Sequence, residues 1–308
     1  MLSRSVSPIQ QIDDPRLARL KVQLYVLRLD LFSKELSGNK YFKLKHNIEA
    51  AKEQGCTTLL SFGGAYSNHI HALALAGQYY GMKTIGIIRG ERHEPLNPTL
   101  QDAEKAGMAL HYVSRQQYRL KSKPEFIACL PEPLQQQFKQ AYVIPEGGSN
   151  ALGVKGCMEI VDHIYHHLSD DFDAIVLPCG TAATLAGVAA ATNNDKKVIG
   201  VSVLKNADYL ADECTAFIRA VTNAPANHWQ ILHDYHHGGY AKTSTALLRF
   251  IAEFTGLHEI PLEPVYSGKM FYGLYDWLSK QAVSSVEGLR IVAIHTGGLQ
   301  GARGFGFH

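Results

Sequence analysis

Short aliphatic runs alternate with longer segments of helical period along this chain, and the alternation limits the fold more than any other feature. A first series begins with TTLLSFGG at residues 57–64 and ends with ALHYVS at 109–114. A second series begins with AYVIPEGG at 141–148 and ends with LRIVAIHTGG at 289–298. Strands that alternate with helices in this way form parallel sheets with helical crossovers. We therefore predict an α/β fold of two open lobes, each built on a parallel sheet.

The N-terminal segment VQLYVLRLD, residues 22–30, predicts a strand that precedes the first series, and a helix-like segment near Lys40 follows it. Residues before about 45 can then join the second lobe, which makes the first lobe an insertion. We predict a large domain from residues 1–45 and 146–308 and a small inserted domain from residues 46–145. The polar stretch 116–140, within the small domain, predicts short helices and turns rather than a linker.

Composition excludes several classes of protein. The 30 basic and 28 acidic side chains are spread along the chain, which is not the pattern of a nucleic-acid binder. The five cysteines are far apart and form no CxxC pair, so we expect neither a disulfide framework nor a thiolate zinc site. The N-terminus has no apolar signal segment, and no apolar run reaches the ~18 residues of a membrane span. We expect a cytoplasmic protein without a membrane partner.

The histidines offer a possible metal site. His163 and His167 have the spacing of a helical ligand pair, and His233, His236 and His237 form a second group. The first pair has no glutamate in an HExxH frame, and the second group lies in a His-rich loop. We expect no metal.

Lys40 follows a glycine at the start of a predicted helix, in the sequence SGNKYFKLK. The positive end of a helix and nearby cations favour the neutral amine, which is the form that attacks a carbonyl. Lys40 is therefore a candidate Schiff-base nucleophile. Lys43 lies on the same helical face and is the rival nucleophile. The structural alternative is a surface helix start, capped by Ser37 or Asn39.

Two turns have the form of anion sites, because each joins a strand to a helix N-terminus through glycine. The turn in SFGGAYSNH suits a carboxylate, although Ser67 is equally an N-cap. The turn in CGTAATLAG, with Gly180, Thr181 and Thr184 as donors, suits a phosphate. Neither turn has the glycines of a nicotinamide-binding fingerprint, which disfavours a dehydrogenase. The later motifs PVYSGK and HTGG place hydroxyl groups near predicted strand ends, where open α/β sheets bind ligands.

Taken in order, seven motifs resemble those of the pyridoxal-phosphate-dependent family that contains 1-aminocyclopropane-1-carboxylate deaminase and D-cysteine desulfhydrase. The resemblance runs from about residue 22 to 298 and is far more specific than any one motif. It implies the tryptophan-synthase-β-like fold, known as fold type II, with pyridoxal 5'-phosphate as cofactor. The motifs are SGNKYFKLK, SFGGAYSNH, PEGGSN, CGTAATLAG, GGYAKTS, PVYSGK and HTGG.

The resemblance also implies roles for individual residues. Lys40 would form the Schiff base, and Asn68 would contact the ring hydroxyl of the cofactor. The phosphate would be held by the loop formed by Gly180, Thr181, Ala182, Ala183 and Thr184. The two alanines replace the more usual glycine or serine, so backbone N–H groups and the threonines would bind the phosphate. The substrate would be contacted by Ser67, Asn68, His69, Tyr240 and Tyr266, of which Ser67 and the two tyrosines would act in catalysis beside Lys40.

The choice of substrate depends on positions 267 and 296. The deaminase pattern has glutamate and leucine there, whereas this chain has Ser267 and Thr296, as in the desulfhydrase pattern. A carboxylate at the ring nitrogen keeps it protonated and makes a stronger electron sink, which cyclopropane opening needs. A hydroxyl at the ring nitrogen leaves a milder sink, adequate for β-elimination of a thiolate. We predict conversion of D-cysteine to pyruvate, ammonia and hydrogen sulfide by a homodimer.

Three alternatives stay open at this point. The first is the cyclopropane deaminase, which gives α-ketobutyrate and ammonia. The second is elimination from other β-substituted D-amino acids, such as D-serine. The third is a non-catalytic ligand-binding protein on the same fold.

Overall fold

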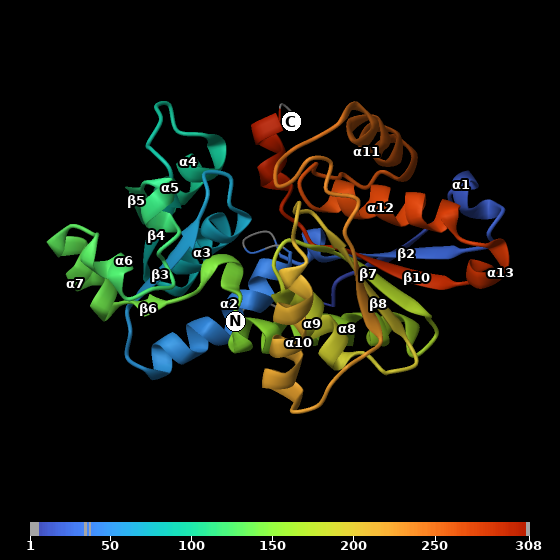
Figure 1. Ribbon diagram of the computed structural model, residues 1–308, viewed down its shortest axis with the longest axis horizontal. Helices are drawn as coiled ribbons and strands as arrows, with labels where there is room; N and C mark the ends of the chain where they lie inside the picture. The colour runs from blue at the N-terminus through green and yellow to red at the C-terminus, as the bar shows by residue number, and fades with distance from the viewer. Residues whose placement is uncertain (1–5, 34–35, 37, 306–308) are drawn as a thin grey trace.

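The described residues form two sheets, and each sheet is the centre of one lobe (Figure 1). The computed structural model describes residues 6–33, 36 and 38–305. Within that part of the chain, the smaller sheet has the order β5-β4-β3-β6 with all pairs parallel. Its strands are β3 (Thr58–Gly63), β4 (Lys83–Arg89), β5 (Met108–Val113) and β6 (Tyr142–Val143).

The larger sheet has the order β1-β2-β10-β7-β8-β9 in the same described part of the chain. The edge strand β1 pairs with β2 in the antiparallel direction, and every other pair is parallel. Its strands are β1 (Ile9–Ile12), β2 (Gln23–Arg28), β7 (Ala174–Cys179), β8 (Lys197–Ser202), β9 (Trp229–Leu232) and β10 (Arg290–His295).

Helices cover both faces of the larger sheet, because its strands are apolar on both sides. On β2, Leu24 and Val26 face one hydrophobic core, while Tyr25 and Leu27 face the other. One core contains α8 (Ala151–Leu168), α9 (Ala182–Ala191) and α10 (Tyr209–Thr222). The opposite core contains α1 (Pro15–Ala18), α11 (Thr245–His258), α12 (Ser267–Lys280) and α13 (Val283–Val286).

The smaller sheet is covered in the same way. One core contains α3 (Asn68–Tyr80) and α4 (Pro98–Lys105). The other contains α5 (Arg115–Tyr118), α6 (Glu125–Ala128) and α7 (Glu132–Gln140), which lie in the polar stretch predicted to hold short helices and turns. Three 3₁₀ turns complete the described elements: η1 (Leu29–Leu31), η2 (Glu146–Gly148) and η3 (Leu299–Phe305).

The helix α2 (Asn39–Glu53) lies between the lobes and belongs to both cores. Its Phe42 packs in a core of the larger sheet, whereas Leu44, Ile48 and Ala51 pack in a core of the smaller sheet. The predicted boundary at residue 45 therefore falls inside one continuous helix (Figure 1). The start of the chain and its last strand pair directly, since β2 lies beside β10.

Most predicted elements are confirmed, and one assignment is wrong. The alternation predicted for the second series is confirmed, with α8 as its first helix. The segment AYVIPEGG was assigned to the second series, but its strand β6 pairs with β3 of the smaller sheet. The sequence of β6 does not reveal its partner strand, because a strand of two residues fits the edge of either sheet. The larger sheet also gains an antiparallel edge that was not predicted.

The helical histidine pair has a structural role. His163 Nδ1 accepts a hydrogen bond from the Ser7 N–H at 3.0 Å, and His167 Nε2 lies 2.9 Å from the Ser7 carbonyl oxygen. Both rings therefore hold the N-terminal segment against α8. Within the described residues, no three His, Cys, Asp or Glu side chains gather in a way that could hold a metal ion.

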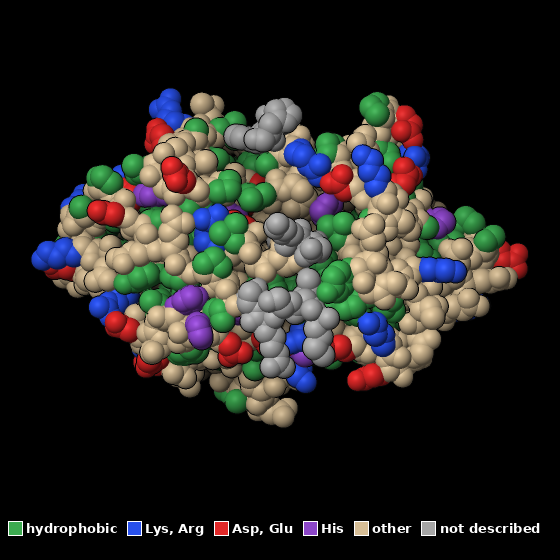
Figure 2. Space-filling view, turned by 180° about the vertical axis from the view of Figure 1, so that it is seen from behind, with side chains coloured by type: hydrophobic (Ala, Val, Ile, Leu, Met, Phe, Trp, Pro, Cys, Tyr) green, Lys and Arg blue, Asp and Glu red, His purple; other side chains and the backbone are tan. Residues whose placement is uncertain are grey.

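The surface mixes charges of both signs. Figure 2 shows basic and acidic side chains interspersed over the face drawn there. No helix in the described part of the chain has the length and apolar character needed to cross a membrane.

A buried carboxylate ties the N-terminal segment to two helices of the larger lobe. The Asp14 side chain is fully buried and accepts hydrogen bonds from Arg16, from Tyr275 Oη at 2.8 Å and from His258 Nε2 at 2.9 Å. Burial alone would raise the pKa of Asp14, but these hydrogen bonds lower it below its usual range. The carboxylate thus stabilises the fold in its ionised form.

Replacing this carboxylate should weaken the fold measurably. We expect Asp14→Asn to lower the free energy of unfolding by about 3 kcal/mol at pH 7, because it leaves buried donors imperfectly paired. The pKa of Asp14 is depressed in the folded state, so its contribution is complete above about pH 4 and is lost as the pH falls further. Urea unfolding midpoints between pH 7 and pH 3 measure both effects.

Asp195→Asn is the matched control, because Asp195 is exposed and pairs with the Lys196 side chain. We expect it to change the free energy of unfolding by less than about 0.5 kcal/mol. Equal midpoints for Asp14→Asn and the wild-type protein at pH 7 would contradict this account.

Candidate active site

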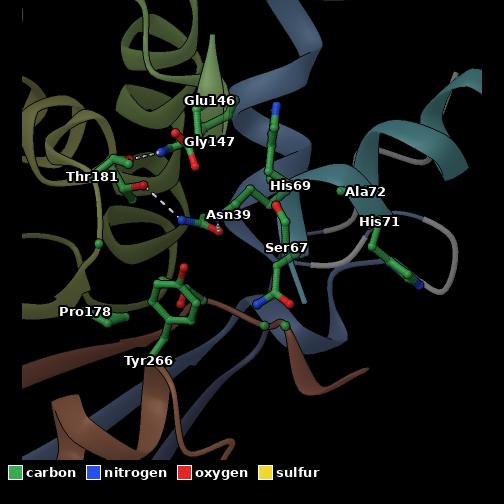
Figure 3. A pocket seen from close by; sticks show the side chains of 18 of the residues that line it. Asn39, Ser67, His69, His71, Ala72, Glu146, Gly147, Pro178, Thr181 and Tyr266 are labelled. Carbon is green, nitrogen blue, oxygen red and sulfur yellow. Dashed lines mark hydrogen bonds between the residues drawn. The ribbon is translucent and has the colours of Figure 1, made fainter. Parts of the chain in front are cut away.

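A cavity of about 500 Å³ lies between the two lobes, at the carboxyl ends of the strands of both sheets. Segments that are far apart in the sequence meet there, including the start of α2, the turns before α3 and α9, and the turn after β10. Figure 3 shows Asn39 between Thr181 on one side and Ser67 on the other, with the ring of Tyr266 nearby. The predicted site residues that line the cavity are Lys40, Ser67, Asn68, His69, Gly180, Thr181, Thr184, Tyr240, Tyr266 and Thr296.

The start of α2 packs against the turn after β10, and this contact places Lys40. Gly38 has a positive φ of 77°, and a side chain at this position would collide with the Thr296 carbonyl group. The Asn39 N–H donates to that same carbonyl oxygen at 3.1 Å. The SGNK and HTGG motifs are therefore one interface. Ser37, the alternative helix cap, lies outside the described residues.

The surroundings of the Lys40 amine favour its neutral form. Loss of hydration and the charge of neighbouring Lys43 lower the pKa of Lys40 from 10.5 to about 7. Its Nζ donates to Asn39 Oδ1 at 3.0 Å and lies 5.9 Å from the centre of the Tyr266 ring. A large share of this amine is thus unprotonated near neutral pH, as a Schiff-base lysine requires.

Lys43 points to the other end of the cavity and is bound to the turn before α9. Its Nζ donates to Thr181 Oγ1 at 3.0 Å, and Ser149 Oγ donates to the same oxygen at 2.8 Å. Because Thr181 accepts two hydrogen bonds, its own hydrogen is available to an anion. Thr181 is the N-cap residue of α9 and makes no side-chain cap bond, so the helix N-terminus keeps free N–H groups.

The rest of the α9 turn is organised from α2. Asn39 Nδ2 donates to Thr184 Oγ1 at 2.9 Å, which links the lysine segment to this helix (Figure 3). Ala182 and Ala183 are buried, and their side chains are absent from the described cavity wall. Only their backbone could contact an anion. Lys43 is therefore a candidate anion ligand. The sequence had suggested it only as a rival Schiff-base nucleophile.

The turn before α3 forms a second polar wall. Ser67 is the N-cap of α3, since its Oγ accepts from the Ile70 N–H at 3.2 Å, and it also lines the cavity. The predicted N-cap is therefore confirmed, and the predicted contact with a substrate carboxylate stays a prediction. Asn68 Oδ1 accepts from Gln300 Nε2 at 3.1 Å. His69 is bonded through Nε2 to Ser61 Oγ at 2.8 Å, and its buried Nδ1 has no partner among the described residues.

Burial and the charges of two lysines keep the His69 ring neutral. Loss of hydration, followed by the charges of Lys40 and Lys43, lowers the pKa of His69 well below 6.5. A neutral imidazole beside two lysines can donate to or accept from a ligand without adding charge.

Two tyrosines lie on the far wall, with their ring centres 6.1 Å apart. Burial raises the pKa of Tyr240 and raises the pKa of Tyr266 well above 10. Both phenols therefore stay protonated and can donate hydrogen bonds. Tyr240 comes from the loop before α11 and Tyr266 from the residue before α12.

Ser267 is the predicted site residue with a hydroxyl that the structure does not bring to the cavity wall. Its side chain is fully buried, and its Oγ lies 3.2 Å from Glu263 Oε1 and accepts from the Glu263 N–H at 3.0 Å. The Glu263 carboxylate accepts from the N–H groups of Val265, Tyr266 and Ser267. Glu263 was missed in the sequence, because only the fold shows that this acid is buried.

Known proteins resemble this arrangement of lobes and cavity. The chain belongs to the pyridoxal-phosphate-dependent enzyme family, whose model matches residues 3–297. It is 33% identical over 315 residues to the mitochondrial bifunctional D-cysteine desulfhydrase/1-aminocyclopropane-1-carboxylate deaminase of Arabidopsis thaliana, covering 97% of this chain and 78% of that protein. It is 26% identical over 298 residues to the D-cysteine desulfhydrase of Salmonella typhi, covering 92% and 89%.

A solved structure described as an ACC deaminase homologue superimposes with a TM-score of 0.86. It is 27% identical to this chain and covers 99% of this chain and 93% of its own. The predicted fold type is therefore confirmed, and the protein is a pyridoxal-phosphate-dependent enzyme.

The cavity fits pyridoxal phosphate on chemical grounds. A phosphate needs several donors and a positive helix end, which Lys43, Thr181 and the start of α9 provide. The aldehyde needs a neutral amine, which Lys40 provides. The unpaired His69 Nδ1 leaves a further polar group for the ring or the substrate.

Capture of the cofactor by the free enzyme should depend on pH as the Lys40 pKa dictates. Only the neutral amine attacks the aldehyde, so we expect the rate of capture to rise with pH and to level off above the pKa of about 7. Stopped-flow absorbance of cofactor-free protein mixed with pyridoxal phosphate measures this rate between pH 6 and pH 10. The Lys40→Ala variant gives the background rate of absorbance change without this amine.

A rate that still rises tenfold per pH unit between pH 8 and pH 10 would contradict this assignment. Such a profile belongs to a lysine with its usual pKa of about 10.4.

Proposed function

We propose that this enzyme eliminates hydrogen sulfide from D-cysteine and gives pyruvate and ammonia. The observation that carries the proposal is a low-pKa lysine, Lys40, between two polar helix starts that suit a phosphate and a carboxylate. Relatives that are named D-cysteine desulfhydrase support the choice of substrate.

The bound cofactor supplies an electron sink for the negative charge that develops at the substrate Cα. The chain supplies binding, orientation and proton transfer. Lys43, Thr181 and the backbone at Gly180 hold the phosphate, with the N–H groups of Ala182, Ala183 and Thr184 at the start of α9. Asn68 would face the ring hydroxyl of the bound cofactor, and the Thr296 hydroxyl would be available to its ring nitrogen.

The substrate carboxylate binds at the start of α3, beside Ser67 and His69. The neutral Lys40 amine removes the proton from Cα, because its pKa of about 7 matches a general base near neutral pH. Tyr240 and Tyr266 flank the substrate and donate hydrogen bonds from their protonated phenols to the departing sulfur. The bond between Cβ and sulfur breaks, and sulfide leaves with the electron pair. Water then hydrolyses the released 2-aminoacrylate to pyruvate and ammonia.

The second candidate is 1-aminocyclopropane-1-carboxylate deamination. One observation favours it: the hydroxyl of Ser267 is bonded to the buried Glu263 carboxylate, so negative charge lies directly behind this position. The bifunctional relative and the deaminase homologue of known structure also support it. Against it, position 267 itself carries no carboxylate, and Ser267 does not reach the cavity wall.

Three further proposals complete the description. We propose the large domain at residues 1–45 and 146–308 with the small domain at 46–145, since the strands of residues 9–28 and 174–295 share one sheet. We also propose a homodimer and a cytoplasmic location, as expected from the sequence.

A substrate panel tests the proposed function. We expect sulfide and pyruvate from D-cysteine with kcat/KM at least ten times that for L-cysteine, and at least ten times that for α-ketobutyrate release from the cyclopropane substrate. Lys40→Ala should abolish turnover and the borohydride-sensitive visible absorption together, because both need the same amine.

Strong activity on the cyclopropane substrate alone would overturn the argument from Ser267 and Thr296. Turnover by cofactor-loaded Lys40→Ala at the wild-type rate would overturn the role of Lys40.

A further inference from the structure

The loop that carries Tyr240 has an unusual backbone. Four of its residues have positive φ: His237 at 51°, Gly238 at 99°, Gly239 at 122° and Ala241 at 54°. Two of these are not glycine, and residues with side chains adopt this conformation only when their surroundings enforce it. The loop therefore needs contacts from outside itself to hold Tyr240 at the cavity.

A buried lysine provides such contacts. Lys269 lies in the first turn of α12, its side chain is fully buried, and its Nζ donates to the carbonyl oxygens of His236 and Gly239, each at 2.8 Å. These carbonyls flank His237 and Gly238, the first two positive-φ residues, and the second carbonyl directly precedes Tyr240. Lys269 is not among the described residues of the cavity wall, so it contacts the loop rather than a ligand.

A buried acid lies on the other side of the same helix start. Glu263 accepts three backbone N–H groups around Tyr266, while Lys269 binds two carbonyl groups before Tyr240. Burial lowers the pKa of Lys269 to about 8, and the Glu263 charge counters the decrease, so the ammonium form prevails at neutral pH. The two buried side chains thus hold the backbones of the two tyrosine segments through hydrogen bonds.

We propose that Lys269 is a positioning residue that holds the loop of residues 236–241 and thereby places Tyr240 opposite Tyr266 across the substrate space. The proposal rests on the proposed function, because it takes Tyr240 as a substrate contact. Loss of the ammonium group leaves two carbonyls without their donor, and the loop then relaxes away from its positive-φ geometry. Cofactor binding is unaffected, because Lys40 and Lys43 lie on other elements.

The experiment compares Lys269→Met with Lys280→Met in the cofactor-loaded enzyme. Lys280 lies in the last turn of the same helix, is exposed and pairs with Asp276, so it is a matched control. We expect Lys269→Met to lower kcat about 100-fold, since a shift of about 1 Å in a positioning group has an effect of this size. The visible absorption should keep its wild-type intensity, and Lys280→Met should match the wild type.

A double-variant cycle with Tyr240→Phe separates positioning from general loss of structure. If Lys269 acts through Tyr240, adding Lys269→Met to Tyr240→Phe should lower kcat by less than about threefold further. Lys269→Arg, which keeps the charge and the donors, should restore at least about ten times the kcat of Lys269→Met. If the decreases in kcat of the two single variants multiply in the double variant, the proposal is overturned. A wild-type kcat in Lys269→Met would also overturn it.

Gly239→Ala decides the question if Lys269→Met does not fold. A methyl group at Gly239 has room, with Lys205 Cβ as its nearest contact at 3.6 Å, but it opposes the φ of 122°. We expect it to reproduce the Tyr240→Phe loss with a normal cofactor spectrum. Unchanged kinetics there would overturn the proposal.

A further measurement distinguishes failure of the proposed function from failure of the proposal for Lys269. All variants are also titrated with D-alanine, which lacks a leaving group, and binding is read from the change in visible absorption. If wild-type enzyme does not turn over D-cysteine, this binding still reports on the position of Tyr240. Weaker D-alanine binding in Lys269→Met, with Lys280→Met normal, supports the proposal, and equal binding in all variants overturns it.

Discussion

The structure depends on two lysine side chains, one helical turn apart on α2, that both lose hydration in the folded protein. The Lys40 amine reaches the cavity, and Lys43 is almost fully buried at the start of α9, where the free N–H groups also carry positive charge. Neither lysine has a carboxylate partner among the described residues, and burial lowers the pKa of each. A dianionic phosphate held by Lys43 and the start of α9, as proposed above, would remove this repulsion and leave Lys40 neutral for chemistry.

This constraint explains why the lobes join through α2. The helix must place Lys43 at α9 of the large lobe and contribute apolar residues to the core of the small lobe, so it belongs to both. Its start is fixed by the contact of Gly38 with the turn after β10, which brings Thr296 to the same cavity. The turn before α3 and the turn before α9 then line the same cavity between the lobes.

Local pattern predicts much of this architecture. The strands β3, β4, β7, β8 and β10 are short and mainly aliphatic, and α8 has a clear helical period with an asparagine cap. Pattern fails where pairing is decided by distant residues. The two-residue strand β6 was assigned to the wrong series, and the edge strands β1 and β9 were not foreseen.

The same limit applies to the site. The ordered motifs identified the residues that line the cavity, because helix starts after glycine turns have one characteristic chemistry. They could not show that Ser267 turns toward Glu263, or that Lys269 holds the loop of Tyr240. Each of these depends on side-chain directions set by tertiary packing.

The central claim is that Lys40, and not Lys43, carries the cofactor. Borohydride reduction of the loaded enzyme fixes the cofactor to its lysine, and fragmentation of the tryptic peptides locates the added mass. The account predicts a pyridoxyl group on Lys40 with Lys43 unmodified. A pyridoxyl group on Lys43 would contradict it.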